Sequence, residues 1–488
     1  MNIDIEPQSG RMKLNLTSLI LYVLAIKVVI FLIDPTVMFF LNDSTRYLDT
    51  AISSYIPPDR SFLYGYLIRW LTFSSQSLTS LVAFQVLCSA ASSILAGYIL
   101  NRFLFVKPVV ATLVSLLCAV APLQLLYERY VMTESVSLLL FALFVTIGYY
   151  YLRHPKIRTL LVLDLAGVFL IAFRLSYLPC VLIGAVVVPA LVFFRHDDGQ
   201  NRGNTGGSRI RKIGNRKRVW IHILLSCLFT YGLHYGYKLI NGTLSNNRPA
   251  YQYRTGDHLL ASWAPLLEEV DFSDPEIAGY FSSEYLFDLK DRFQRMNHRW
   301  SQFGLVGYMV QLYGSRAEAN EAAYATAMNI LHRDPLGIVG LALRSYADYW
   351  NVALLKKNLL IDRSGKEYPA PLIEILKSHY HINAEGLGFR KTLTNQYFFN
   401  AIPWFMVLFS LPLVIAAVLF IDKGRRLIPL ALLGSYGLLL LINSTVLIHR
   451  NTMRFFHPAE WIALIFLGVF FDRITKRKLI SPYKGFWY

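Results

Sequence analysis

Apolar runs separated by short polar segments repeat along most of the chain. A helix needs roughly 20 apolar residues to cross the hydrocarbon core of a bilayer, and about ten runs approach that length. The pattern therefore predicts an all-α polytopic membrane protein built around a bundle of about ten transmembrane helices. The runs are residues 14–41, 78–101, 108–127, 135–152, 157–173, 176–194, 219–239, 400–421, 427–448 and 458–471.

A long hydrophilic segment, residues 240–399, divides the predicted bundle into two parts. It mixes charged, aromatic and helix-forming residues, so we expect a mostly helical extracytoplasmic domain. The remaining parts are an N-terminal transmembrane module, residues 1–239, and C-terminal transmembrane helices with a cytoplasmic tail, residues 400–488.

Two helices are predicted inside the hydrophilic segment. Residues 317–333 and 336–355 have helical patterns that meet at Asp334 and Pro335, a typical helix start. The apolar stretches 302–313 and 335–355 are expected to be helices of this domain or interfacial segments, because charged residues interrupt the second.

The composition also indicates a membrane protein. The 488 residues are 55% hydrophobic and 16% charged, with a mean hydropathy of +0.40, which is atypical of a soluble enzyme of this size. The four cysteines lie in predicted spans, so no disulfide framework is implied: Cys88, Cys118, Cys180 and Cys227.

The net charge of +17 is explained by the topology, since Lys and Arg accumulate on cytoplasmic loops. The loop 195–218 is strongly basic and is therefore predicted to be cytoplasmic. Alternating the spans from this loop makes further basic segments cytoplasmic: 102–107, 153–158, 422–426 and the tail after Asp472. Because the basic residues flank membrane spans, we expect membrane lipids and no nucleic acid as partners.

The same alternation gathers the unusual polar segments on the opposite, extracytoplasmic face. These segments are 42–77, 128–134, 174–179, 240–399 and 449–458. An active site at the membrane surface would need its polar segments to lie on the same face of the membrane.

Asp43 is the first candidate for chemistry, because it lies just past the first apolar run, at the start of the outer loop 42–77. The alternative is a carboxylate that caps a helix terminus. Glu134 leads directly into an apolar run, where a carboxylate is costly unless it is paired. Capping by Thr133 or Glu134 is the alternative there. Residues 61–75 suit an amphipathic interfacial helix.

Several basic side chains on the same predicted face could hold a lipid phosphate, because arginine can bind phosphate bidentately. Ordinary contact with lipid headgroups is the alternative reading of each. The candidates are Arg60, Arg129, Arg174, Arg450 and Arg454. We find no glycine-rich phosphate loop, no HExxH and no nucleophile elbow, and residues 379–381 are too short a signal for a metal site.

These motifs together resemble the GT-C membrane glycosyltransferases, especially the aminoarabinose-transferase and protein-mannosyltransferase branch. Asp43, Tyr47 and Ala51 match that family's Asp-Glu-x-x-Tyr…Ala signature, but Ser44 replaces its second acid. The later matches are short and scattered over the membrane portion: Tyr64 with the preceding prolines, Thr133–Glu134, Arg174 with Pro179, and Arg454 to Pro458.

The resemblance implies an inverting glycosyltransferase that moves a sugar from a polyprenyl-phosphate donor to an acceptor hydroxyl. Asp43 is then the expected general base and Glu134 a second catalytic carboxylate. The arginines named above are expected to bind the donor phosphate. Tyr47, Tyr64 and His457 are candidates for substrate binding.

The acceptor is expected to be a glycan, lipid or protein, and the membrane a bacterial inner membrane with the site on its periplasmic side. No cofactor is expected, and Ser44 makes a divalent metal less expected. The alternatives are a lipid-linked oligosaccharide ligase or polymerase of the same fold, a lipid-linked sugar transporter or flippase, and a non-catalytic scaffold.

Overall fold

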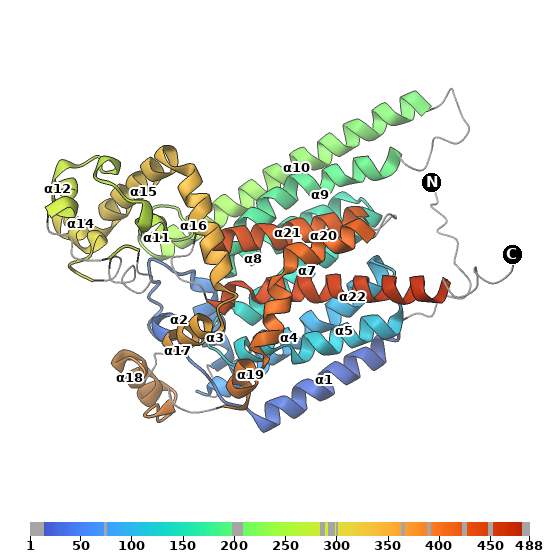
Figure 1. Ribbon diagram of the computed structural model, residues 1–488, viewed down its shortest axis with the longest axis horizontal. Coiled ribbons are helices and arrows are strands. Elements are labelled where there is room, and N and C mark those ends of the chain that lie inside the picture. Colours follow the sequence, from blue (N-terminus) through green and yellow to red (C-terminus); the bar gives the residue numbers. More distant parts are fainter. Residues whose placement is uncertain are drawn as a thin grey trace.

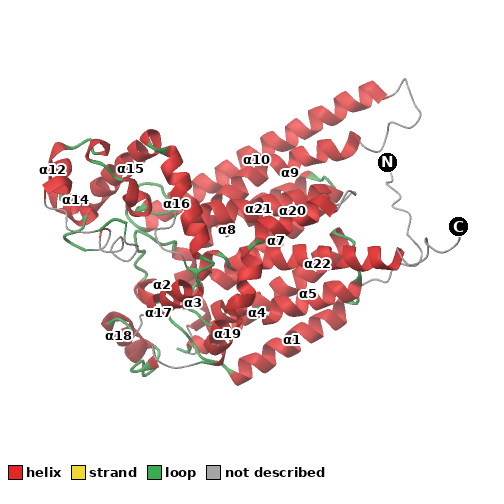
Figure 2. Cartoon of the chain, in the orientation of Figure 1, coloured by secondary structure: helices red, strands yellow, loops and turns green. Residues whose placement is uncertain are grey.

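The computed structural model describes residues 14–72, 76–197, 208–283, 288–290, 298, 301–362, 367–387, 392–421, 427–447 and 452–480. In this part of the chain the secondary structure is helical apart from one isolated β-bridge (Figures 1 and 2). The expected all-α class is thus confirmed for the described residues.

The first half of the chain forms most of the bundle. Its helices are α1 (Leu16–Ile33), α2 (Leu41–Ser53), α3 (Phe62–Thr72), α4 (Leu78–Tyr98), α5 (Pro108–Val120), α6 (Pro122–Tyr127), α7 (Glu134–Arg153), α8 (Ile157–Phe173), α9 (Leu178–Asp197) and α10 (Ser208–Leu244). Short helical turns η1 (Ile99–Phe103) and η2 (Leu175–Tyr177) continue α4 and precede α9.

The second half first leaves the bundle and then returns to it. The intervening segment forms α11 (Thr255–Trp263), η3 (Ala264–Leu266), η4 (Glu269–Asp271), α12 (Pro275–Ser283), α14 (Leu305–Tyr313), α15 (Arg316–Arg333), α16 (Pro335–Asp348), α17 (Val352–Asp362) and α18 (Ala370–His379). Of these, α17 already packs on the bundle through the buried Leu355. The chain returns in α19 (Leu393–Phe409), α20 (Leu411–Ile421), α21 (Leu427–Val446), η6 (Met453–Phe455) and α22 (His457–Ile480).

Apolar length supports a membrane protein, but about ten spans are not confirmed. Among the described residues, five helices are long and apolar enough to cross a bilayer: Leu16–Ile33, Leu78–Phe103, Glu134–Arg153, Leu175–Val192 and Leu427–Val446. Helix α1 has the apolar outer surface expected of a membrane span, because Leu21 and Leu32 are exposed. Its residues Leu19, Val23 and Lys27 are buried against the bundle.

Three of the predicted spans are interrupted. In the run 14–41, α1 ends at Ile33 and α2 begins only at Leu41. The run 108–127 is split at Ala121, whose extended ψ of 132° separates α5 from α6. The residue before a proline is forced out of the helical region, and Pro122 follows here. The run 400–421 is likewise divided at Ser410, between α19 and α20.

Four clusters of buried side chains lie among the described residues, and the smallest packs α1 against α4 and α5. The largest joins α4–α9 to α19–α22, and Trp461 extends it by donating from Nε1 to the Ser92 carbonyl over 3.0 Å. A second cluster packs α18 against α2 and α3 through residues such as Leu372 and Leu48. The third is the separate core of α11, α12 and α14–α16, which extend from one end of the bundle (Figure 1).

The helix junction predicted at Asp334 is confirmed, because α15 ends at Arg333 and α16 begins at Pro335. The Asp334 carboxylate accepts from the Gly337 N–H over 2.7 Å, which caps α16. Helix α16 is shorter than predicted and ends at Asp348, and α17 begins four residues later.

Segments that the charge pattern assigned to one side do lie together. Arg153 donates to the carbonyl of Arg102, and the Lys107 N–H donates to the Asp472 carboxylate over 3.1 Å. These contacts join the 102–107 and 153–158 turns and α22 at one end of the bundle. The loops 198–207 and 422–426 lie outside the described residues.

Candidate active site

Asp43 lies in the first turn of α2, which begins after the extended residue Phe40. This segment was expected to be a loop, but a helix runs from Leu41 and ends at Ser53, followed by Ser54 in the left-handed region with φ 63°. The Asp43 side chain is 19% exposed and pairs with arginines rather than capping the helix.

The backbone brings Asp43 and Glu134 into one region. The Met38 N–H donates to the Arg129 carbonyl, and the Val131 N–H donates to the Met38 carbonyl, both over 2.9 Å. Ser44 Oγ then donates to the Val131 carbonyl over 3.0 Å. These bonds join the chain entering α2 to the chain entering α7, where Glu134 is the first residue.

Ion pairs connect the two carboxylates to three arginines, which we call the Arg–Asp cluster: Asp43, Arg60, Glu134, Arg174 and Arg454. Asp43 pairs with Arg60 through Oδ1, and with Arg454 Nη1 through Oδ2 over 2.6 Å. Glu134 Oε1 lies 3.0 Å from Arg174 Nη1 and 3.7 Å from Arg454 Nε. Arg454 therefore lies between both carboxylates.

The cluster carries one net positive charge, because three guanidiniums face two carboxylates. Burial alone would raise the pKa of Asp43, but Arg60 and Arg454 outweigh it and hold that pKa well below its usual range. The pKa of Arg454 is raised because Asp43 and Glu134 outweigh its burial. The free site is therefore an ionised cluster with an excess of positive charge, which suits an anionic ligand.

Contacts with aromatic rings and the backbone orient the arginines. Arg454 Cζ lies 5.3 Å from the Phe40 ring centroid and 4.8 Å from that of Phe455. Arg174 Cζ lies 5.1 Å from the Phe455 centroid, and its Nη2 donates to the Arg454 carbonyl over 3.1 Å. Such cation–π contacts restrain a guanidinium without using its N–H donors.

Some polar atoms of the cluster have no hydrogen-bond partner within the described residues. Arg60 Nε and Arg454 Nε are buried donors of this kind, and Glu134 Oε2 is a buried acceptor. Buried polar groups are normally hydrogen-bonded, so these atoms call for an explanation. A ligand with a phosphate and a hydroxyl group could satisfy both kinds.

Tyr47 and Tyr64, two of the candidates for substrate binding, have different neighbours. Arg60 Cζ lies 5.7 Å from the Tyr47 ring centroid, so Tyr47 borders the cluster. Tyr64 packs edge-on against Tyr47 at 4.8 Å and donates to Gln85 Oε1 over 2.7 Å. With no exposed surface, Tyr64 supports Tyr47 and cannot contact a ligand in this conformation.

His457 is the first residue of α22 and is buried against Tyr127, with ring centroids 5.4 Å apart. Neither of its ring nitrogens has a hydrogen-bond partner in the part of the chain described. It follows Arg454 by three positions and experiences the charge of Arg174, although no hydrogen bond joins it to the Arg–Asp cluster among the described residues.

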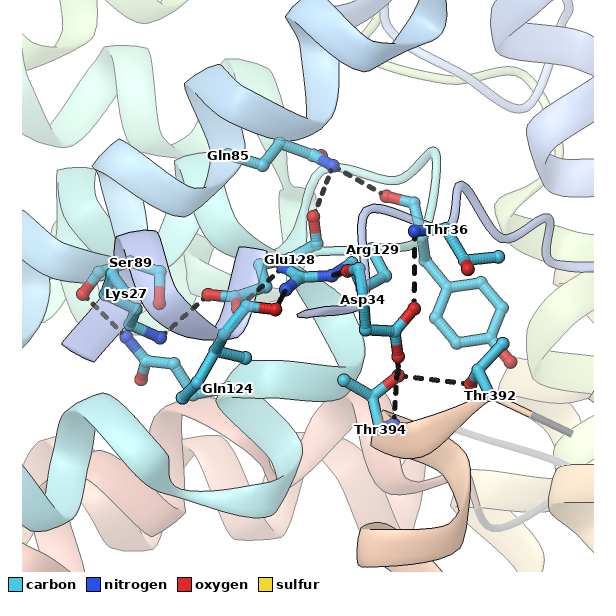
Figure 3. A network of polar contacts seen from close by, with 12 residues as sticks. Lys27, Asp34, Thr36, Gln85, Ser89, Gln124, Glu128, Arg129, Thr392 and Thr394 are labelled. Carbon is cyan, nitrogen blue, oxygen red and sulfur yellow. Dashed lines mark hydrogen bonds and ion pairs between the residues drawn. The ribbon is translucent and has the colours of Figure 1, made fainter. Parts of the chain in front are cut away.

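Arg129 lies apart from the cluster, in a network that joins α1, α6 and α19 (Figure 3). It pairs with Glu128 at 2.8 Å, and its Nε donates to the Asp34 carbonyl over 2.8 Å. Lys27 Nζ pairs with the other Glu128 oxygen at 2.8 Å. Because Arg129 is fully buried with these partners, we leave it out of the phosphate site. Arg450, the fifth arginine predicted to bind phosphate, lies outside the described residues.

Two residues of these surroundings were not singled out from the sequence. Asp59 pairs with Arg46 and lies 4.0 Å from Arg60, so a further ion pair borders the cluster without changing its net charge. Its position next to Arg60 was the available signal. Lys27 was signalled by being one of two charged residues, with Asp34, within the apolar run 14–41.

No group of three or more His, Cys, Asp or Glu side chains that could hold a metal occurs among the residues the structure describes. Comparison with known proteins yields no matching family model, no similar curated protein and no similar solved structure.

Proposed function

We propose that the protein is an inverting membrane glycosyltransferase that uses a polyprenyl-phosphate-linked sugar, with its site on the extracytoplasmic face of a bacterial inner membrane. The observation that carries the proposal is the Arg–Asp cluster at the end of a bundle of apolar helices. Arg60, Arg174 and Arg454 supply positive charge and unsatisfied N–H donors, as a lipid phosphate requires. Asp43 and Glu134 supply the acid–base groups.

The lipid environment favours a donor of this class. Exposed apolar side chains cover α1, and α9 and α21 are also apolar enough to span a bilayer. A polyprenyl chain can lie along such helices while its phosphate remains at their polar end. The acceptor is a glycan, lipid or protein that bears a hydroxyl group.

In the proposed reaction Asp43 accepts the proton of the acceptor hydroxyl. The hydroxyl oxygen forms a bond to the anomeric carbon as the bond from that carbon to the phosphate oxygen breaks. The electron pair leaves with polyprenyl phosphate, whose charge the arginines stabilise. General-base assistance of this kind contributes about 10²–10⁴-fold. Glu134 holds Arg174 and Arg454 in place and offers Oε2 to the acceptor.

A transporter of lipid-linked sugars is the second candidate. The buried network of Lys27, Glu128 and Arg129 favours it, because ionisable groups inside a membrane often mark transport paths. However, each of these three charges is paired, whereas the Arg–Asp cluster has unsatisfied donors. We therefore place glycosyl transfer first.

The test uses membranes that contain wild type, Asp43→Asn or Asp49→Asn at matched protein levels. Asp49 is the control, because it lies on the same helix and, within the described part of the chain, its carboxylate accepts from Ser53 Oγ over 3.2 Å and pairs with no arginine. Each is supplied with radiolabelled lipid-linked sugars, and release of polyprenyl phosphate is measured. Release by wild type and Asp49→Asn but not by Asp43→Asn is expected.

Equal release by all three proteins would remove Asp43 as the base. Movement of labelled lipid across the bilayer without release would instead favour the transporter.

A further inference from the structure

Two of the three arginines proposed for the donor phosphate, Arg60 and Arg454, are already engaged by the proposed base. Each Asp43 oxygen is paired with a different guanidinium, Oδ1 with Arg60 and Oδ2 with Arg454. A carboxylate held in this way is a poor proton acceptor, and both arginines have part of their donor capacity occupied by it. The free site therefore suits neither general-base catalysis nor full phosphate binding.

The geometry offers a way to change partners. Arg60 and Arg454 each keep a buried Nε that makes no hydrogen bond among the described residues, and the nearest carboxylate oxygen to that of Arg454, Glu134 Oε1, is 3.7 Å away. A guanidinium has five N–H donors in a fixed fork, so it can bind a phosphate bidentately. Arg174 is less free to move, since it donates to the Arg454 carbonyl over 3.1 Å and to Ser176 Oγ over 3.1 Å.

We propose that binding of the donor phosphate displaces Asp43 from Arg60 and Arg454, so that the base is released only when the donor is present. This inference rests on the proposed function and concerns the order of events at that site. The phosphate and the Asp43 carboxylate compete for the same N–H donors. Arg174 and Glu134 remain paired during the exchange and hold the surrounding helix ends.

The electrostatics agree with this order. The pKa of Asp43 is held low mainly because Arg60 and Arg454 outweigh the effect of burial. Losing both partners, and gaining a phosphate nearby, raises the pKa of Asp43 towards the range of a useful base. An acceptor hydroxyl is then deprotonated only beside a bound donor.

The first test measures binding of farnesyl phosphate, a short polyprenyl phosphate, to purified protein in detergent. In Asp43→Asn the competing carboxylate is absent, so binding is expected to tighten by about tenfold relative to wild type. Asp49→Asn is the matched control and should bind as wild type does. Equal or weaker binding by Asp43→Asn would overturn the exchange, because it would make Asp43 a support of the phosphate site.

The second test uses wild-type protein and so does not depend on the folding of a variant. A water-soluble carbodiimide modifies protonated carboxyl groups, and mass spectrometry quantifies the modification of Asp43. Farnesyl phosphate is expected to increase modification of Asp43 severalfold and to leave Asp49 unchanged. A decrease or no change at Asp43 would refute its release.

The outcomes separate this inference from the proposed function. If wild type binds no farnesyl phosphate, both the phosphate site and the exchange are refuted. If wild type binds it but Asp43→Asn binds no tighter, only the exchange fails and the glycosyltransferase proposal stands.

Discussion

The buried ion network around Glu128 makes a quantitative prediction about stability. Lys27 and Arg129 both pair with this carboxylate at 2.8 Å, and the three side chains are at most 1% exposed. Removing one partner of a buried ion pair costs about 3–5 kcal/mol when the other charge is left uncompensated. Glu128→Gln leaves two cations without a carboxylate partner, so we expect it to cost about 3–5 kcal/mol of unfolding free energy.

Lys27→Met should cost less, because Glu128 keeps its pair with Arg129. The loss is then one charge-assisted hydrogen bond, worth about 1.5–3 kcal/mol. In the double variant the two effects should not add, since the same bond is removed only once. The order expected for destabilisation is thus Glu128→Gln above Lys27→Met, with a double variant below their sum.

The assay is unfolding of the purified protein in detergent, followed by circular dichroism as denaturant is added. Lys377→Met is the control, because Lys377 is exposed on α18 and should change stability by less than about 0.5 kcal/mol. Equal effects of Glu128→Gln and Lys27→Met, or full additivity, would show that Glu128 is not shared between Lys27 and Arg129.

Three further predictions concern the site and its support. Gly65→Ala should destabilise the protein by about 1–3 kcal/mol, because the added Cβ would lie 2.5 Å from Thr50 Cβ. Gly232→Ala is the control, since a Cβ at that position has no atom within 4 Å, and thermal unfolding compares the two variants. Arg174→Gln should weaken farnesyl phosphate binding by about tenfold, and unchanged affinity would exclude Arg174 from the phosphate site. The pKa of Asp43 is lowered on folding, so the ionised Asp43 stabilises the folded protein above the ordinary carboxyl pKa of about 4, and this contribution is lost as the pH falls further. Asp43→Asn should therefore lose less stability on acidification than wild type does, measured as unfolding midpoints from pH 7 to pH 3.

Apolar periodicity predicted the helical class and the junction at Asp334–Pro335, because both depend on local composition. It did not predict how the runs divide. The length of the run 108–127 predicts one span, but Pro122 within it forces Ala121 into an extended conformation that divides the helix. Similarly, residues 42–51 are polar enough to be expected as a loop, yet they form α2 because Leu48 and Ala51 bury one face against α3 and α18.

The partners within the candidate site could not be predicted from local sequence. Arg454 pairs with Asp43 across 411 positions, and no local pattern specifies which polar turns of a bundle will meet. All five arginine candidates had similar contexts, beside apolar runs on one predicted face. What separates Arg129 from Arg174 and Arg454 is the neighbouring Glu128, which the Lys27 of another helix also reaches. An acidic neighbour does not by itself decide the matter, because Arg60 follows Asp59, whose carboxylate pairs with Arg46 and lies 4.0 Å from Arg60. Which carboxylate compensates which arginine depends on contacts between distant segments, and these the local sequence does not specify.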